Sequence, residues 1–135
     1  MTTGYSGTPL AKKLNLRDGM RVWFDAMPED VFDEIAEYAL ELTFVANPAD
    51  GIDGAHLFVT DRAALEKRLT PLRQQIASDG QIWVSWPKQA SGVASDITED
   101  TIREFALPLG LVDTKVCAVD DVWSGLKLVI RKELR

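Results

Sequence analysis

This sequence of 135 residues has one cysteine and one histidine, and these small counts exclude several kinds of site. A single cysteine, Cys117, cannot form a disulfide within the chain. Zinc needs three or four Cys, His or carboxylate ligands, so Cys117 and His56 are a poor beginning for a metal centre, and we expect none. A Cys–His nucleophilic pair needs only one residue of each kind. Both residues lie in predicted strands, however, where they are more often packing residues.

The sequence also lacks long apolar runs and an excess of positive charge. Nothing approaches the roughly 20 apolar residues that a membrane-crossing helix requires. The first residues, MTTGYSGTPLAKKL, contain no apolar segment of the signal-peptide type, so we expect a cytoplasmic protein with no membrane partner. The formal net charge is −6, and the 15 Lys and Arg residues are scattered along the chain. Because nucleic-acid binding depends on Lys and Arg that neutralise phosphates, we expect no nucleic-acid partner.

What the sequence does contain is the composition of an ordinary globular protein, with 46% apolar and 27% charged residues. Its length suits one compact domain, and we predict a single α/β domain over residues 1–135. Apolar patterns predict strands at residues 20–26, 42–46, 55–60, 81–86, 111–119 and 126–132. Helical patterns lie between them, and this alternation is typical of a three-layer α/β domain.

Several helix boundaries can be predicted from capping residues. Thr8 and Pro9 have the pattern of an N-cap and a first helical position. Asp61 and Thr98 are predicted caps of later helices, and Pro71 is expected to kink or split the helix that contains it. The helix that Pro28 opens has an apolar face at helical spacing, formed by Val31, Phe32, Ile35, Ala36 and Ala39.

Three stretches, GYSGTPLAKKL, VSWPKQASGVASDITED and GLVDTKVCAVDDVWSGLKLV, resemble a family of small bacterial proteins carried as a domain of unknown function. The likeness covers most of the chain. It implies no activity, because the family has none assigned.

A second, looser likeness is to the Rossmann-like fold of S-adenosylmethionine-dependent methyltransferases. AKKLNLRDGMRVWFDA is similar to their first helix and strand, and SDGQIWVSWPK to their strand before the substrate loop. The closing hairpin is similar to their antiparallel edge. This resemblance implies a three-layer Rossmann-like fold, with a mostly parallel sheet and a C-terminal antiparallel β-hairpin.

The sequence departs from these methyltransferases where the cofactor would bind. Their first strand is followed by a glycine-rich turn, because only glycine lets the backbone approach the ligand closely. Here that turn reads DAMPED, with no glycine between Asp25 and Asp30, and Pro28 removes an amide donor. The second strand ends in ANPAD, without an acidic residue at its tip for ribose hydroxyls. We therefore expect no cofactor.

The loop after the fourth predicted strand is the first candidate site. It runs for eleven residues, from Pro87 to Ile97, whereas such connections usually have roughly two to six. Ligands of open α/β sheets bind beyond the carboxyl ends of the strands. The predicted ligand-binding residues are Trp86, Lys88, Ser91, Gly92, Ser95 and Asp96. The alternative is that Trp86 packs in the core and Lys88 is a solvated charge.

Two other segments are weaker candidates. In DDVWSGLK, Asp120 and Asp121 are adjacent carboxylates, but hairpin turns favour Asp for local hydrogen bonds, and a structural turn is the better interpretation. Trp123 either packs over the sheet edge or serves as an interaction anchor with Asp120. In the N-terminal TGYSGTP, Tyr5, Ser6 and Thr8 could add polar groups near the strand ends.

These observations leave three hypotheses for function. The first is a binding protein without a cofactor site, which takes a small anionic ligand or a protein partner at the strand carboxyl ends. The second is an enzyme that uses Lys88, Asp96 and Asp120 for acid–base chemistry on a small substrate. The third is a structural domain that forms a homodimer through its hairpin edge, with an apolar contact over residues 126–130. The sequence favours binding over catalysis.

Overall fold

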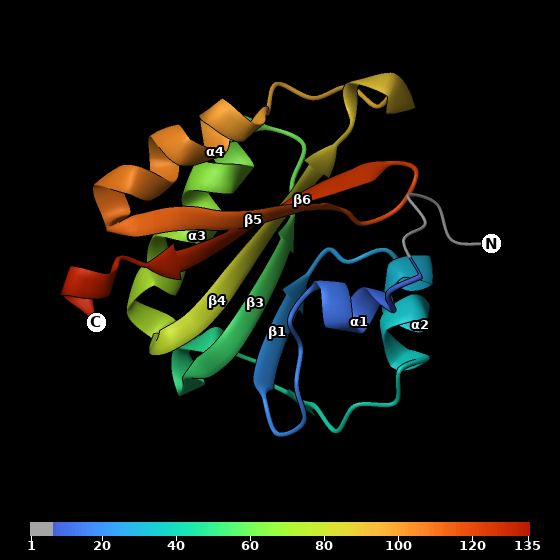
Figure 1. Cartoon of the computed structure of the whole chain (residues 1–135). Helices are drawn as coiled ribbons and strands as arrows, with labels where there is room; N and C mark the ends of the chain where they lie inside the picture. The colour runs from blue at the N-terminus through green and yellow to red at the C-terminus, as the bar shows by residue number, and fades with distance from the viewer. Residues whose placement is uncertain (1–6) are drawn as a thin grey trace.

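The fold is one twisted six-stranded sheet with helices on both faces (Figure 1). This is a computed structural model that describes residues 7–135. The strand order is β2-β1-β3-β4-β6-β5. Neighbouring strands among β1 to β4 are parallel, and β6 is antiparallel to both of its neighbours. The strands are β1 (Arg21–Asp25), β2 (Thr43–Phe44), β3 (Ile52–Phe58), β4 (Ile76–Pro87), β5 (Leu111–Ala118) and β6 (Trp123–Ile130).

The helices complete three layers, which confirms the predicted Rossmann-like α/β fold. Figure 1 shows α3 and α4 on one face of the sheet and α1 and α2 on the other. Their bounds are α1 (Leu10–Lys13), α2 (Glu29–Ala36), α3 (Arg62–Gln75) and α4 (Glu99–Ala106), with short 3₁₀ turns at Pro48–Asp50, Gln89–Ser91, Leu107–Leu109 and Lys132–Leu134. No helix within residues 7–135 is both long enough and apolar enough to cross a bilayer.

Each face of the sheet has its own apolar core. Leu65, Leu69 and Leu72 of α3 pack against the sheet together with Ile102 of α4. On the opposite face, α1 and α2 bury Leu10, Leu14, Val31 and Ile35 against Val22 and Trp83. Strands β3 and β4 are covered on both sides, which explains why every residue over 54–58 and 80–87 is buried.

The predicted caps at Asp61 and Thr98 are confirmed. The Asp61 carboxylate accepts a hydrogen bond from the Ala64 amide, and Thr98 forms a reciprocal capping box with Thr101. Helix α3 continues through Pro71 without splitting. The predicted cap at Thr8 is wrong: Pro9 is in the extended N-cap conformation, and α1 begins one residue later without a side-chain cap.

Three further sequence predictions need correction. In α2 only Val31 and Ile35 are buried, whereas Phe32, Ala36 and Ala39 are exposed, because the helix ends at Ala36 and covers little of the sheet. Strand β4 begins at Ile76 rather than at residue 81, and pairs with Ile52 before its register shifts. Residues 126–130 cannot form a dimer edge, because β6 lies between β4 and β5.

On the hairpin side the edge strand is β5, and it carries two features that oppose pairing with another chain. Its register with β6 shifts between Asp113 and Lys115, which marks an irregularity in the strand. The side chain of Lys115 is exposed at this edge. Bulges and edge lysines are common means of blocking edge-to-edge association.

Candidate functional site at the strand ends

The six predicted ligand-binding residues do not line one common site in the structure. Trp86, Ser95 and Asp96 line one hollow of about 490 Å³ beside the start of α4, but Lys88, Ser91 and Gly92 do not line it. No Lys or Arg is among its lining residues, which include the carboxylates of Asp96 and Glu99. This hollow therefore offers little to an anion.

Lys88 points toward the hairpin turn instead. Its Nζ donates to the backbone oxygen of Asp120 at 2.6 Å, and its amide donates to the oxygen of Val122 at 2.7 Å. Ser91 closes its own turn by donating to the Lys88 oxygen, and Gly92 ends that turn with a φ of 78°. These three residues hold the loop in place.

The remaining predicted groups also have structural partners. Asp96 Oδ1 accepts from the Arg62 amide at 2.9 Å, and Asp96 donates its own amide to the Thr60 oxygen. Asp120 Oδ1 accepts from the amides of Val122 and Trp123, as expected of a structural turn. The side chains of Lys88, Asp96 and Asp120 thus serve different local contacts, and no hydrogen bond joins any two of them within residues 7–135.

The side chain of Trp123 packs against the core and does not project from the surface as an anchor would. Its ring lies edge-on to Phe58, with 5.1 Å between ring centroids, and it belongs to the core on the α1 and α2 side. Tyr5 and Ser6 lie outside the described residues, and Thr8 is exposed.

Within residues 7–135, no hydrogen bond joins the side chains of His56 and Cys117, as a nucleophilic pair would require. Nε2 of His56 lies 2.7 Å from Oγ of Ser85, and burial lowers the pKa of this imidazole to about 3. Burial raises the pKa of the half-buried Cys117 thiol, although Lys13 and Lys115 oppose that effect. Within the same residues, no three His, Cys, Asp or Glu side chains gather in a way that could hold a metal ion.

The turn after β1 takes a shape that usually requires glycine, although it contains none. Ala26 has a φ of 58°, in the left-handed region that side chains rarely adopt. The Asp25 carboxylate just before it is paired with Arg68 of α3 at 2.9 Å. Pro28 follows in the extended conformation and has no amide hydrogen to offer.

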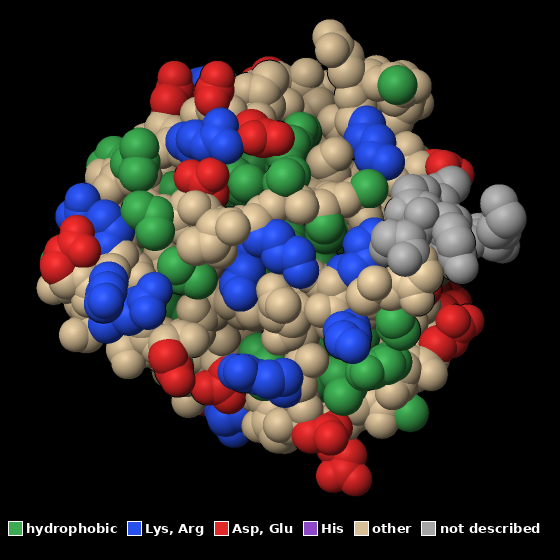
Figure 2. Space-filling model, viewed as in Figure 1, with side chains coloured by type: hydrophobic (Ala, Val, Ile, Leu, Met, Phe, Trp, Pro, Cys, Tyr) green, Lys and Arg blue, Asp and Glu red, His purple; other side chains and the backbone are tan. Residues whose placement is uncertain are grey.

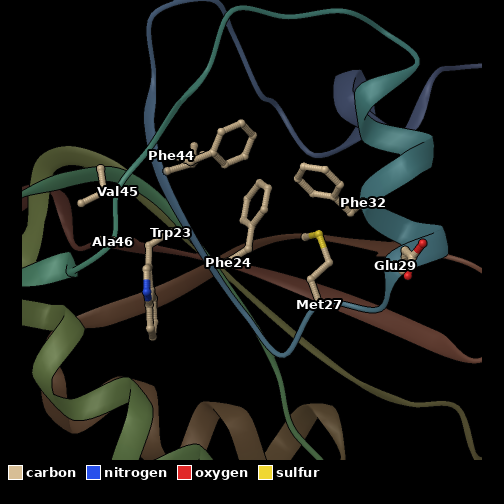
Figure 3. A pocket seen from close by; sticks show the side chains of 9 residues that line it. Trp23, Phe24, Met27, Glu29, Phe32, Phe44, Val45 and Ala46 are labelled. Atoms are coloured by element: carbon tan, nitrogen blue, oxygen red, sulfur yellow. The ribbon is translucent and has the colours of Figure 1, made fainter.

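A second hollow of the strand ends, lined mostly by apolar side chains, lies beside this turn, between β1, β2 and α2. It measures about 500 Å³, and Figure 3 shows the rings of Phe24, Phe32 and Phe44 pointing toward one another with Met27. The ring centroids of Phe24 and Phe44 are 5.7 Å apart, and those of Phe32 and Phe44 are 5.6 Å apart. Phe44 is 55% exposed and Phe32 38% exposed.

One charged residue, Glu29, lines this aromatic hollow, and it begins a segment that is rich in acidic residues. Residues 29–41 contain six Asp and Glu residues and no Lys or Arg: Glu29, Asp30, Asp33, Glu34, Glu37 and Glu41. None of the six takes part in an ion pair within residues 7–135. The pKa of Glu34 is raised by partial burial and by the neighbouring Glu37, while Lys13 opposes the shift. Not all six lie at the hollow, since the Glu41 backbone oxygen accepts from the Gly19 amide near the opposite end of the sheet. The negative charge beside the hollow therefore comes from Glu29 and the start of α2.

The aromatic hollow was not predicted from the sequence, because its residues come from three separate segments that only the fold brings together. A signal was present, since Phe24 and Phe44 lie near the ends of the first two predicted strands. Phe32, however, was predicted to be buried, whereas it is 38% exposed in the structure.

Solved structures with a similar fold include several methyltransferases. The chain is similar to an O-methyltransferase from neocarzinostatin biosynthesis, with a TM-score of 0.60 and 12% identity over 82% of this chain and 48% of the enzyme. It is also similar to precorrin-6y C5,15-methyltransferase from Geobacter metallireducens, with a TM-score of 0.55 and 12% identity over 90% of this chain and 85% of the other. A third similar structure is magnesium protoporphyrin IX methyltransferase from Synechocystis PCC 6803, with a TM-score of 0.55 and 12% identity over 90% of this chain and 74% of the enzyme.

These similarities show the fold, and the chain spans about half the length of the first of these enzymes. The strand ends of this chain do not suit the cofactor S-adenosylmethionine. The first turn has neither glycine nor an amide at Pro28, the nearby Asp25 is paired with Arg68, and phenylalanine rings occupy the surface beside it.

A comparison with curated proteins found no match. One family profile matches residues 11–132, nearly the whole sequence. The chain therefore belongs to DUF3052, a family of proteins of unknown function, and it has a methyltransferase-like fold.

Proposed function

We propose that this chain is a non-catalytic binding domain, and that its strand ends take an apolar, positively charged segment of a partner protein. The observation that carries the proposal is the aromatic hollow of Phe24, Phe32 and Phe44, with two of its rings substantially exposed. Aromatic side chains that gather at a surface often serve as anchors for binding.

The charge around the hollow favours a basic partner. Glu29 lines the hollow, and neither Glu29 nor the neighbouring Asp30 forms an ion pair within residues 7–135. Complementary charge speeds encounter and selects among partners. A segment with an apolar anchor flanked by Lys or Arg fits both the aromatic rings of the hollow and the carboxylate of Glu29.

The other hypotheses receive less support. Acid–base catalysis by Lys88, Asp96 and Asp120 would need their side chains to converge. Lys88 and Asp120 instead hold the hairpin turn through backbone groups, and Asp96 accepts from the Arg62 amide at the start of α3. Homodimer formation through β5 is opposed by the irregularity and the lysine of that edge.

The proposal can be tested by fluorescence polarisation with labelled synthetic peptides. KKLFKLFKK supplies apolar and basic groups, EELFELFEE reverses the charge, and KKSSKSSKK removes the apolar groups. We expect the first peptide to bind at least about ten-fold more tightly than either of the others. Equal binding of all three peptides would overturn the proposal.

Matched variants locate the binding. Phe44→Ser should weaken binding of KKLFKLFKK about ten-fold, because it removes an exposed aromatic anchor. Val116→Ser is the control, since Val116 is 53% exposed on β5 and lies outside the hollow. If both variants bind alike, the aromatic hollow is not the docking site.

A further inference from the structure

Cations from distant parts of the chain gather on one face of the molecule. Lys12 and Lys13 of α1, and Arg17 just after it, meet Lys115 of β5 and Lys127 of β6. Figure 2 shows Lys and Arg side chains collected over α1 and the β5–β6 hairpin. The charge is scattered in the sequence, but the fold concentrates it.

Hydrogen bonds hold this basic patch together across the two elements. Lys13 Nζ donates to the Ala118 oxygen at 3.0 Å, and Lys115 Nζ donates to the Lys13 oxygen at 2.6 Å. Lys127 Nζ donates to Oδ1 of Asn15 at 3.2 Å. The ammonium groups are thus fixed in position by neutral acceptors.

None of the five cations has a carboxylate partner within the described part of the chain. The six ion pairs found there involve other basic residues. Lys127 is half-buried, and its pKa is lowered by burial and then by repulsion from Lys115 and Arg17. Crowded cations without counter-charges gain stability when an anion binds among them.

A hollow of about 350 Å³ opens within this patch, at the end of the sheet opposite the aromatic hollow. Lys12, Arg17 and Lys127 line it together with the amides of Asn15 and Gln81, and Asp79 is its one carboxylate. Its volume is within the range of small-molecule sites, roughly 300–1,000 Å³. The lining combines a planar guanidinium with ammonium point charges, both of which bind phosphate oxygens.

We propose that this basic hollow binds a multiply charged small anion of the phosphate class, either a free oligophosphate or the phosphate groups of an organic molecule. Three cations oppose a single carboxylate there, so the hollow carries a net positive charge in a chain whose formal net charge is −6. A nucleic-acid strand fits less well, because no aromatic side chain lines the hollow for base stacking. The site is independent of the aromatic hollow, with which it shares no residue.

Isothermal titration calorimetry at constant ionic strength tests this proposal. We expect sodium tripolyphosphate to bind one per chain and orthophosphate to bind at least about ten-fold more weakly, because fewer charges are neutralised. ATP should bind and adenosine should not if organic phosphates are taken. Tripolyphosphate and ATP both failing to bind would overturn the proposal.

Charge-matched variants identify the site. Arg17→Gln and Lys127→Gln should each weaken tripolyphosphate binding about ten-fold. Lys67→Gln makes the same change in net charge on the exposed side of α3 and should leave binding unaltered. Arg17 is exposed, so its variant tests the site even if the half-buried Lys127 variant folds poorly. Equal losses in all three variants would indicate only a general charge effect and overturn the proposal, as would tighter binding of a single-stranded oligonucleotide than of tripolyphosphate.

Discussion

His56 Nε2 and Ser85 Oγ lie 2.7 Å apart in the interior, where the histidine is 2% exposed and the serine is fully buried. The imidazole stacks on Phe58, with ring centroids 4.5 Å apart. His56 belongs to β3, which lies between β1 and β4 in the sheet. Because a charged imidazole would lose its hydration there, the fold requires the neutral form. The pair is a buried polar contact of the core.

The first prediction is a loss of stability in mild acid. The pKa of His56 is lowered from 6.5 to about 3 in the folded chain, so the unfolded chain binds a proton that the folded chain does not. The free energy of unfolding should therefore fall as the pH drops from about 6.5 toward 3, by up to about 1.4 kcal/mol per pH unit. Between pH 7 and 5.5 we expect a loss of about 1 kcal/mol, measured by urea denaturation.

The variant His56→Leu separates this effect from other titrations. It removes the ionisable group, so its free energy of unfolding should change less between pH 7 and 5.5, whatever its absolute stability. An unchanged pH dependence in this variant would show that another group is responsible.

The order of elements could be predicted because periodicity and caps are local signals. The β-α alternation, the caps at Asp61 and Thr98, and the antiparallel closing hairpin all follow from residues near one another in the sequence. Boundaries were less accurate where tertiary pairing decides them. Strand β4 begins at Ile76 because that residue pairs with Ile52 across the sheet, and nothing near Ile76 in the sequence announces it.

The candidate sites could not be predicted because they depend on contacts between distant segments. Lys88 was predicted to bind a ligand, but in the fold its ammonium group donates to the Asp120 oxygen of the hairpin turn. The basic patch joins α1 to residues about a hundred positions later, as the contact between Lys13 and Ala118 shows. Only the sheet order brings those segments together.

The second prediction concerns the strained turn after β1. Ala26→Gly should raise the free energy of unfolding by about 1 kcal/mol, because glycine adopts a positive φ without steric cost. Ala63→Gly, at an exposed position in α3, is the control and should lower it by up to about 1 kcal/mol. If both variants are destabilised equally, the turn at Ala26 is not strained.

The third prediction concerns close packing at Gly125 of β6. A Cβ there would lie 3.2 Å from Trp83 and 3.3 Å from both Ser85 Oγ and a Val119 methyl carbon. Gly125→Ala should therefore cost about 1–3 kcal/mol, through overpacking rather than backbone strain. Ser124→Ala, at the neighbouring half-buried position, should cost less in the same denaturation experiment. A neutral Gly125→Ala would mean that the sheet relaxes to accept the methyl group.

The last prediction separates a structural role of Lys88 from a role in anion binding. Lys88→Met keeps most of the length of the side chain but leaves the Asp120 oxygen without its ammonium donor, which should cost about 1 kcal/mol of unfolding free energy. Amide exchange at Val122 and Trp123 should accelerate, because the hairpin turn loses one of its two hydrogen bonds to Lys88. Lys132→Met, at an exposed position near the C-terminus, should change neither measurement. Tripolyphosphate affinity should stay the same in both variants, since Lys88 does not line the basic hollow. A large loss of affinity in Lys88→Met alone would return the anion site to the strand carboxyl ends.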